Sequence, residues 1–127
     1  MNGNQLVAGI QPMHGTKLAV YDEAGKKEII SEGFGQGHAL AIDHITGDPS
    51  SVQIVAGWRE PDLEGKVGIK IFTAKSSAYK EWTMYWIDQN GIACEDLQVA
   101  DINGDGRKDI IAAGRSTHNL KIYWNRK

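Results

Sequence analysis

The sequence lacks a second cysteine, a long apolar run and any marked excess of charge of one sign. Cys94 is the only cysteine among 127 residues, so no disulfide can form within the chain. No apolar run is long enough to span a bilayer, and residues 1–5 lack the basic and apolar segments of a signal peptide. The net charge of −2 gives no electrostatic reason to expect a nucleic acid or an anionic membrane as partner.

Glycine, in contrast, is abundant. The chain has 15 glycines without being of low complexity, which indicates many tight turns between short elements. Hydrophobic residues make up 41% and charged residues 24% of the sequence, as in ordinary globular domains. At this length, the chain can form one domain with a sizeable core.

One pattern occurs three times along the chain. Segments 5–9, 53–57 and 110–114 are apolar and end in Ala-Gly, at intervals of roughly 50 residues. A loop follows each, and then comes a second apolar run, at 17–21, 68–72 and 119–123. Before the later two copies, segment 38–43 matches segment 96–101. This regular spacing predicts a repeat protein built from similar units.

The repeated segments are typical of β-strands. They are short, rich in β-branched and aromatic residues, and bounded by Gly, Pro, Asn or Asp. The continuously apolar segments are expected to be buried on both faces. Segment 81–88 could pass for a helix on hydrophobicity alone, but its aromatic residues favour a strand. The sequence therefore predicts an all-β fold.

The repeat length and strand content predict a partial β-propeller. Its single domain would hold three blades, at about residues 4–33, 37–89 and 94–127. The middle blade has four expected strands, at 38–42, 52–56, 67–73 and 82–88, whereas the other two are incomplete. Because a ring needs about four to eight blades, we expect either self-association, with two chains giving six blades, or a longer propeller from which this chain comes.

Segment 101–109 is the strongest local signal. Side-chain oxygens of Asp101, Asn103, Asp105 and Asp109, with the Arg107 carbonyl, could wrap a hard cation such as calcium. An EF-hand is disfavoured because Ala112 stands where that loop needs a glutamate and because strands flank the segment. The alternative without a metal is an Asp- and Gly-rich hairpin turn.

Segment 101–114 as a whole resembles the FG-GAP/VCBS repeat, which is known from integrin α-subunit propellers and many bacterial secreted proteins. The resemblance implies a β-propeller with calcium bound between the first two strands of a blade, and an extracellular or cell-surface location. The second copy departs from this motif: it keeps Asp43 and Asp48, but Val52 is aligned with Asp109.

Chemically active side chains gather at the opposite ends of the expected strands. They fall in segments 36–38, 58–60, 94–96 and 115–119. The candidate ligand-binding residues are His38, Trp58, Arg59, Glu95, Asp96, Arg115 and His118. Such a set could bind a sugar through an aromatic face and bidentate polar groups. Alternatively, Glu95 and Asp96 pair with Arg59 or Arg115 and tie neighbouring blades together.

Three functions follow from these observations. The first is a calcium-stabilised binding module for carbohydrate or protein, since no nucleophile or phosphate-loop signature occurs. The second is a sugar lyase or dehydratase, in which His38, Glu95, Asp96 and His118 would hold a metal and move protons. The third is a structural segment that acts by assembly.

Overall fold

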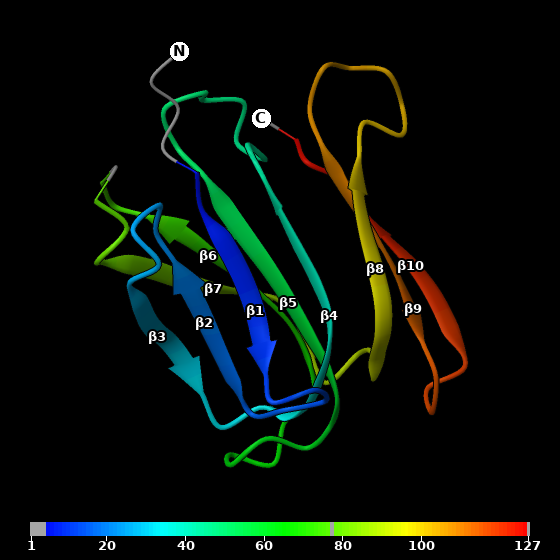
Figure 1. Ribbon diagram of the computed structural model, residues 1–127. Coiled ribbons are helices and arrows are strands. Elements are labelled where there is room, and N and C mark those ends of the chain that lie inside the picture. The colour runs from blue at the N-terminus through cyan, green and yellow to red at the C-terminus, as the bar shows by residue number, and fades with distance from the viewer. Residues whose placement is uncertain (1–4, 77, 127) are drawn as a thin grey trace.

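The computed structural model, which describes residues 5–76 and 78–126, consists of β-strands without any α-helix in that part of the chain (Figure 1). The strands are β1 (Val7–Gln11), β2 (Lys17–Tyr21), β3 (Lys27–Glu32), β4 (Gly35–Asp43), β5 (Gln53–Glu60), β6 (Gly68–Ala74), β7 (Trp82–Gln89), β8 (Cys94–Ala100), β9 (Asp109–Gly114) and β10 (Asn119–Tyr123). The all-β prediction is confirmed, and the helical alternative for segment 81–88 is wrong. No helix long and apolar enough to cross a membrane occurs among the described residues.

The strands form three antiparallel sheets, each from strands that follow one another in sequence. Sheet 1 has the order β1-β2-β3, sheet 2 the order β4-β5-β6-β7, and sheet 3 the order β8-β9-β10. The middle sheet is thus the one with four strands, as the repeat pattern predicted. The expected outer limits at residues 4 and 127 lie outside the described residues.

The sheets are stacked, with β4 in contact with both β1 and β8 (Figure 1). One hydrophobic cluster fills the space between sheets 1 and 2; it includes Leu18, Ile54 and Trp58, all fully buried. A second cluster lies between sheets 2 and 3 and includes Val55 and Leu97. The first six residues of β5 are buried, which confirms the expectation of a strand covered on both faces.

The two interfaces have the same arrangement. In β5, Ile54 and Ala56 belong to the cluster with sheet 1, whereas Val55 belongs to the cluster with sheet 3. At the loop end, Gln53 pairs with Asp43 in sheet 2, and Asp109 pairs with Ala100 in sheet 3. Gln53 and Asp109 therefore hold equivalent positions, and so do the residues that follow them, Ile54 and Ile110. Because Ile110 packs toward sheet 2, sheets 2 and 3 use opposite faces at their interface. The sheets therefore stack front to back. The front of sheets 1 and 2 is the face turned toward the next sheet in sequence, and the back is the other face. The front of sheet 3 is the corresponding face, which points away from sheet 2.

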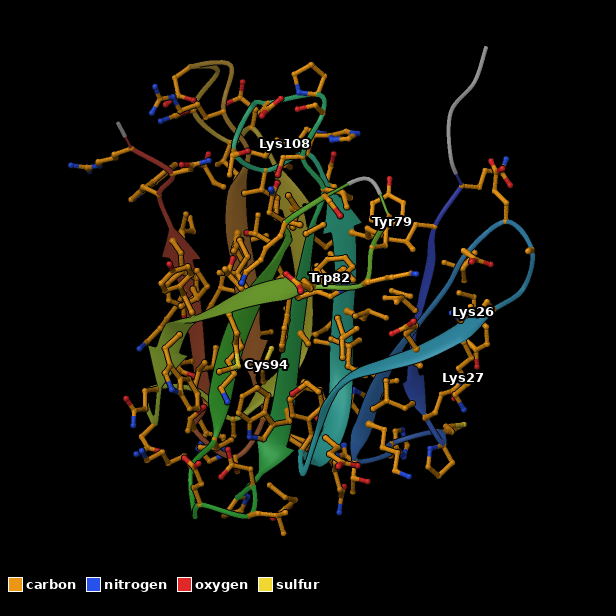
Figure 2. All side chains as sticks on the ribbon, turned by 90° about the vertical axis from the view of Figure 1, so that its left-hand side faces the viewer. Lys26, Lys27, Tyr79, Trp82, Cys94 and Lys108 are labelled. Atoms are coloured by element: carbon orange, nitrogen blue, oxygen red, sulfur yellow. The ribbon has the colours of Figure 1, made fainter. Side chains whose placement is uncertain are left out.

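A close approach between β5 and β8 holds sheets 2 and 3 together. A Cβ atom placed on Gly57 would lie 2.6 Å from Sγ and 2.8 Å from Cβ of Cys94. Cys94 is fully buried inside the stack (Figure 2). Only a glycine at position 57 allows the two backbones this separation.

The described sheets do not close into a ring. The back of sheet 1 exposes Val7 and the front of sheet 3 exposes Leu120, with 62% and 68% of their surfaces accessible. No strand from the described part of the chain covers either face.

Candidate functional site

The two groups of candidate residues lie at opposite ends of the strands. At the loop end, segment 44–52 joins β4 to β5 and segment 101–108 joins β8 to β9. At the polar end, β4 and β8 begin, and β5 and β9 end. The candidate calcium ligands belong to the loop end, where Figure 2 also shows Lys108. The candidate ligand-binding residues belong to the polar end.

Asp101 organises the loop that follows β8. Its carboxylate accepts hydrogen bonds from the backbone N–H groups of Gly104 (2.8 Å), Asp105 (3.1 Å) and Gly106 (2.8 Å). Gly104 and Gly106 have φ angles of 77° and 86°, which L-residues with a side chain rarely adopt. The two glycines thus let the backbone wrap around the Asp101 carboxylate.

Asp109 closes the same loop from its other end. The carboxylate is buried and accepts hydrogen bonds from the Ile102 N–H at 3.0 Å and the Asn125 N–H at 2.9 Å. Asp105 and Asn103 are exposed, and the Asn103 amide donates to the Asp105 carboxylate at 3.4 Å. The loop is therefore held by its own carboxylates, with two exposed oxygen-bearing side chains near its tip.

The donor set of this loop suits a hard cation. All four side chains offer oxygen, and a carboxylate has roughly four lone-pair sites, so Asp101 and Asp109 keep unused acceptor capacity. In the part of the chain that the structure describes, however, no three His, Cys, Asp or Glu side chains are gathered around a common point. Coordination would require the exposed side chains of Asn103 and Asp105 to turn inward.

The second loop is aligned differently from the sequence prediction. The strand registers place Gln53, not Val52, at the position of Asp109, and His44, not Asp43, at that of Asp101. Gln53 is fully buried, and its Oε1 accepts the Ile45 N–H at 2.6 Å, as Asp109 accepts the Ile102 N–H. The predicted one-to-one match of segments 38–43 and 96–101 is wrong by one residue.

Asp43, at the end of β4, pairs with a residue of the loop between β8 and β9. Asp101, in contrast, accepts hydrogen bonds from the backbone of its own loop. Its carboxylate accepts a hydrogen bond from Lys108 Nζ at 2.6 Å. Burial by itself raises the pKa of Asp43, but the bonds from Lys108 and from the His44 N–H outweigh it, so the pKa is lowered. Asp43 is therefore a charged structural link between the end of β4 in sheet 2 and the loop that precedes β9 in sheet 3.

Glu95 is the centre of the polar end. Arg59 Nη1 lies 3.0 Å from both carboxylate oxygens, His38 Nε2 lies 3.6 Å away and Arg115 Nη1 lies 3.8 Å away. The hydrogen bond from Arg59, followed by the nearby charges, lowers the pKa of Glu95. The alternative that Glu95 ties neighbouring sheets together is confirmed, because Arg59 belongs to β5 and Glu95 to β8.

His38 and Glu95 occupy corresponding irregularities in their strands. The ladder shifts between Gly37 and Ala39 in β4, and between Cys94 and Asp96 in β8. Such bulges redirect a side chain. His38 Nδ1 bonds the Glu95 carbonyl oxygen at 2.6 Å, and the His38 ring stacks on His14, with 4.6 Å between ring centroids. This contact chain joins all three sheets at the polar end.

Two predicted ligand-binding residues lie elsewhere. Trp58 is fully buried, stacks on Phe34, and donates its indole N–H to the Lys66 carbonyl at 2.9 Å. Its ring face is therefore not available to a ligand. Asp96 is exposed and accepts the Leu97 N–H, and it forms no ion pair with any described residue. It does not share the guanidinium groups that Glu95 binds.

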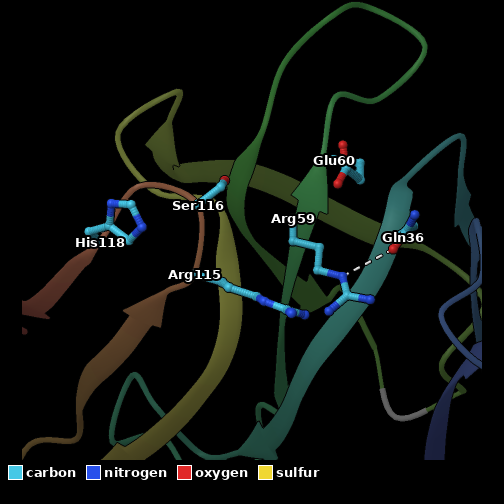
Figure 3. A pocket seen from close by; sticks show the side chains of 6 residues that line it. All are labelled: Gln36, Arg59, Glu60, Arg115, Ser116 and His118. Atoms are coloured by element: carbon cyan, nitrogen blue, oxygen red, sulfur yellow. Dashed lines mark hydrogen bonds between the residues drawn. The ribbon is translucent and has the colours of Figure 1, made fainter.

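A pocket of about 350 Å³ is lined by both arginines that pair with Glu95 (Figure 3). Its walls are polar: they consist of Gln36, Arg59, Glu60, Arg115, Ser116 and His118. Arg59 Nε donates to Gln36 Oε1 at 3.0 Å, which leaves Nη2 without a hydrogen bond to the described residues. The structure thus brings together the predicted residues Arg59, Arg115 and His118. Gln36, Glu60 and Ser116 fall in the expected segments but were not singled out individually.

A partly buried ion pair between sheets 2 and 3 was not predicted. Asp88, at the end of β7, accepts hydrogen bonds from Lys121 Nζ (2.8 Å), Tyr123 Oη (2.6 Å) and the Gly91 N–H (2.7 Å). Burial raises the pKa of Asp88, but these three bonds outweigh it and the pKa is lowered. Burial and the neighbouring Asp88 carboxylate raise the pKa of Tyr123. This group joins the outer strands of sheets 2 and 3.

No protein-family model, curated protein or solved structure matches the chain.

Proposed function

We propose that the chain is a calcium-stabilised segment of a β-propeller and that it acts as a binding module, with its ligand at the polar end. The front-to-back stacking of three antiparallel sheets supports the propeller arrangement, because successive blades pack in this way. The observation that carries the binding function is the polar pocket with two guanidinium groups between β4, β5 and the β9–β10 connection.

The hydrogen-bond donors in the pocket favour a ligand that carries a carboxylate. Glu95 is shared by the guanidinium groups of Arg59 and Arg115, which leaves N–H donors of both groups for a ligand, although Glu60 in the pocket wall balances the second positive charge. Among the described residues, Glu60 forms no ion pair with either arginine. Arginine binds carboxylates in a planar, bidentate geometry. We therefore expect a carbohydrate or protein segment that carries a carboxylate, and not a neutral sugar stacked on Trp58, which is buried.

The comparison of Gln53 with Asp109 supports the calcium site. Both side chains are buried and both accept the backbone N–H two residues into their loop, so a neutral amide is sufficient for this structural role. A buried carboxylate without a cation is more costly than an amide. Sheet 3 nevertheless has the carboxylate, and the same loop carries the carboxylates of Asp101 and Asp105. A calcium ion would neutralise them and cross-link the loop; Asp101, Asn103, Asp105, Arg107 and Asp109 would hold it.

Calcium loops of modest affinity suit an extracellular or cell-surface protein, where calcium reaches millimolar levels. We include this location in the proposal. The sugar lyase or dehydratase alternative is disfavoured, because the lowered pKa of Glu95 and its bonds to Arg59 make it a poor general base near neutral pH.

Binding to acidic and neutral oligosaccharides, and to acidic and neutral peptides, tests the proposed function. We expect uronic-acid oligosaccharides or acidic peptides to bind, with an affinity that falls as salt rises. Arg115, whose side chain is 71% exposed, can be changed to Gln without opening the core, and this should weaken binding by about tenfold, the loss of one charge-assisted hydrogen bond. Arg126→Gln, at the loop end, is the matched control. Equal binding of neutral and acidic ligands, or no binding of either, would refute the proposal.

A further inference from the structure

The stack of sheets has two uncovered faces that carry apolar side chains. On the front of sheet 3, Leu120 is 68% and Ile122 39% exposed. A shallow hollow of about 160 Å³ lies on this face, lined by Gln98, Ile111, Ala113 and Leu120 among others. On the back of sheet 1, Val7 is 62% and Ile29 41% exposed. Apolar groups concentrated on two flat faces mark interaction surfaces.

The packing inside the chain shows what each of these faces fits. The front of sheet 1 packs on the back of sheet 2, and the front of sheet 2 packs on the back of sheet 3. Both interfaces are thus of one type, front against back. The two uncovered faces are one front and one back. The uncovered front could therefore pack on the uncovered back in the same way as the internal interfaces. The two faces lie on opposite sides of one molecule, so they cannot meet within it.

We infer that a second copy of this chain covers both faces, with the front of sheet 3 of each copy against the back of sheet 1 of the other. The two new interfaces are related by a two-fold axis, so the contacts close on themselves and do not continue into a filament. The closed ring has six sheets, within the range of about four to eight that propellers adopt. The inference rests on the proposed propeller arrangement, but not on the calcium site or on the pocket.

The charges of the two uncovered faces are complementary. Asp96 on the front of sheet 3 is exposed and without an ion pair among the described residues. Lys17 pairs with Gln11 in the ladder and is exposed on the back of sheet 1. Both residues lie at the polar end, as the contacts from His14 through His38 to Glu95 show. The two faces that would meet thus carry opposite charges at the same end of the strands.

Solution mass at several protein concentrations tests this inference. We expect a species of about twice 13.9 kDa that dissociates on dilution. Leu120→Asp and Val7→Asp should each raise the dissociation constant about tenfold or more, because each places a charge in one of the two apolar contacts. Leu63→Asp is the matched control: Leu63 is 90% exposed but lies between β5 and β6, away from both faces. Circular dichroism spectra confirm that each variant is folded.

Mixing the variants identifies which faces meet. A mixture of Leu120→Asp and Val7→Asp retains one intact front and one intact back, so it should form a dimer through that one interface at a concentration where each variant alone is monomeric. The double variant Asp96→Lys and Lys17→Asp should likewise recover the dimer that Asp96→Lys weakens. A monomer at all concentrations, an open polymer, or a Val7→Asp variant that dimerises as tightly as the unchanged chain would overturn the inference. Calcium binding and ligand binding are measured separately, so these outcomes do not depend on the proposed function.

Discussion

Replacing Gly57 by alanine tests the closest approach between sheets 2 and 3. The new methyl group would lie 2.6 Å from Sγ and 2.8 Å from Cβ of Cys94. Ordinary carbon contacts lie near 3.5–4.0 Å, so the two strands must move apart by roughly 1 Å. Cys94 cannot turn away into solvent, because it is fully buried between the sheets.

The expected loss of stability follows from this overlap. Overpacking a core by one methyl group costs about 1–3 kcal/mol. For a chain of 127 residues, that loss lowers the melting temperature by roughly 4 °C per kcal/mol, or about 4–12 °C. The matched control is Gly9→Ala, since Gly9 ends the equivalent apolar segment but its added Cβ would meet nothing closer than Gln11 Nε2 at 3.9 Å. Gly9→Ala should leave stability unchanged or raise it slightly.

Urea and thermal unfolding, followed by circular dichroism, measure both changes. All variants are made in the Leu120→Asp background, so that association of two copies does not contribute. Cys94→Ala removes the nearer of the two contact atoms. The pair Gly57→Ala and Cys94→Ala should therefore cost less than the sum of the two single changes, by about 1 kcal/mol. If Gly57→Ala is as stable as Gly9→Ala, or if the two changes are additive, the close packing of β5 on β8 is wrong.

Three further predictions concern the other sites. Calcium at about 10 mM should stabilise the fold by about 1.5–3 kcal/mol if its dissociation constant is about 0.1–1 mM. Thermal unfolding with and without calcium measures this gain. Asp105→Asn should abolish the gain but leave the stability in the presence of a chelator unchanged. Asp88→Asn should cost about 2–3 kcal/mol at neutral pH. Because the pKa of folded Asp88 is lowered, its contribution is present above about pH 4 and is lost as pH falls further, so acid unfolding of Asp88→Asn should depend less on pH. Since burial, with nearby carboxylates, raises the pKa of Cys94 to about 12, its alkylation at pH 8 should be about a thousandfold slower than that of an exposed thiol until urea unfolds the chain.

The all-β fold could be predicted because its signals are local. Short apolar runs bounded by glycine, asparagine or aspartate specify strands and turns without reference to distant residues. The burial of β5 on both faces followed in the same way from its continuous apolar sequence. The direction of stacking could not be predicted in this way. It depends on which face of each sheet packs against the next sheet, and that choice depends on the side chains of both sheets.

The alignment of the repeats was wrong by one residue. The sequence comparison matched the two Ala-Gly ends, Gly57 with Gly114, whereas the ladder that places Gln53 level with Asp109 also places Gly57 level with Ala113. A comparison of sequences aligns Val52 with Asp109, whereas the ladder aligns Gln53 with it. The burial of Trp58 was missed for a related reason, since its position after the apolar segment 53–57 resembles a strand end, yet β5 continues to Glu60.

The bulge in β8 also separates two acidic neighbours that look equivalent in the sequence. Glu95 occupies the irregular position and turns toward Arg59 on β5, where it stabilises the contact between sheets within one chain. Asp96 re-enters the ladder opposite Ala113 and lies on the uncovered front of sheet 3. Adjacent carboxylates thus serve different contacts: Glu95→Gln should weaken the stack and the pocket of a single chain, whereas Asp96→Asn should change only the association of two chains. If both substitutions alter unfolding of the dissociated monomer equally, this division between the two carboxylates is wrong.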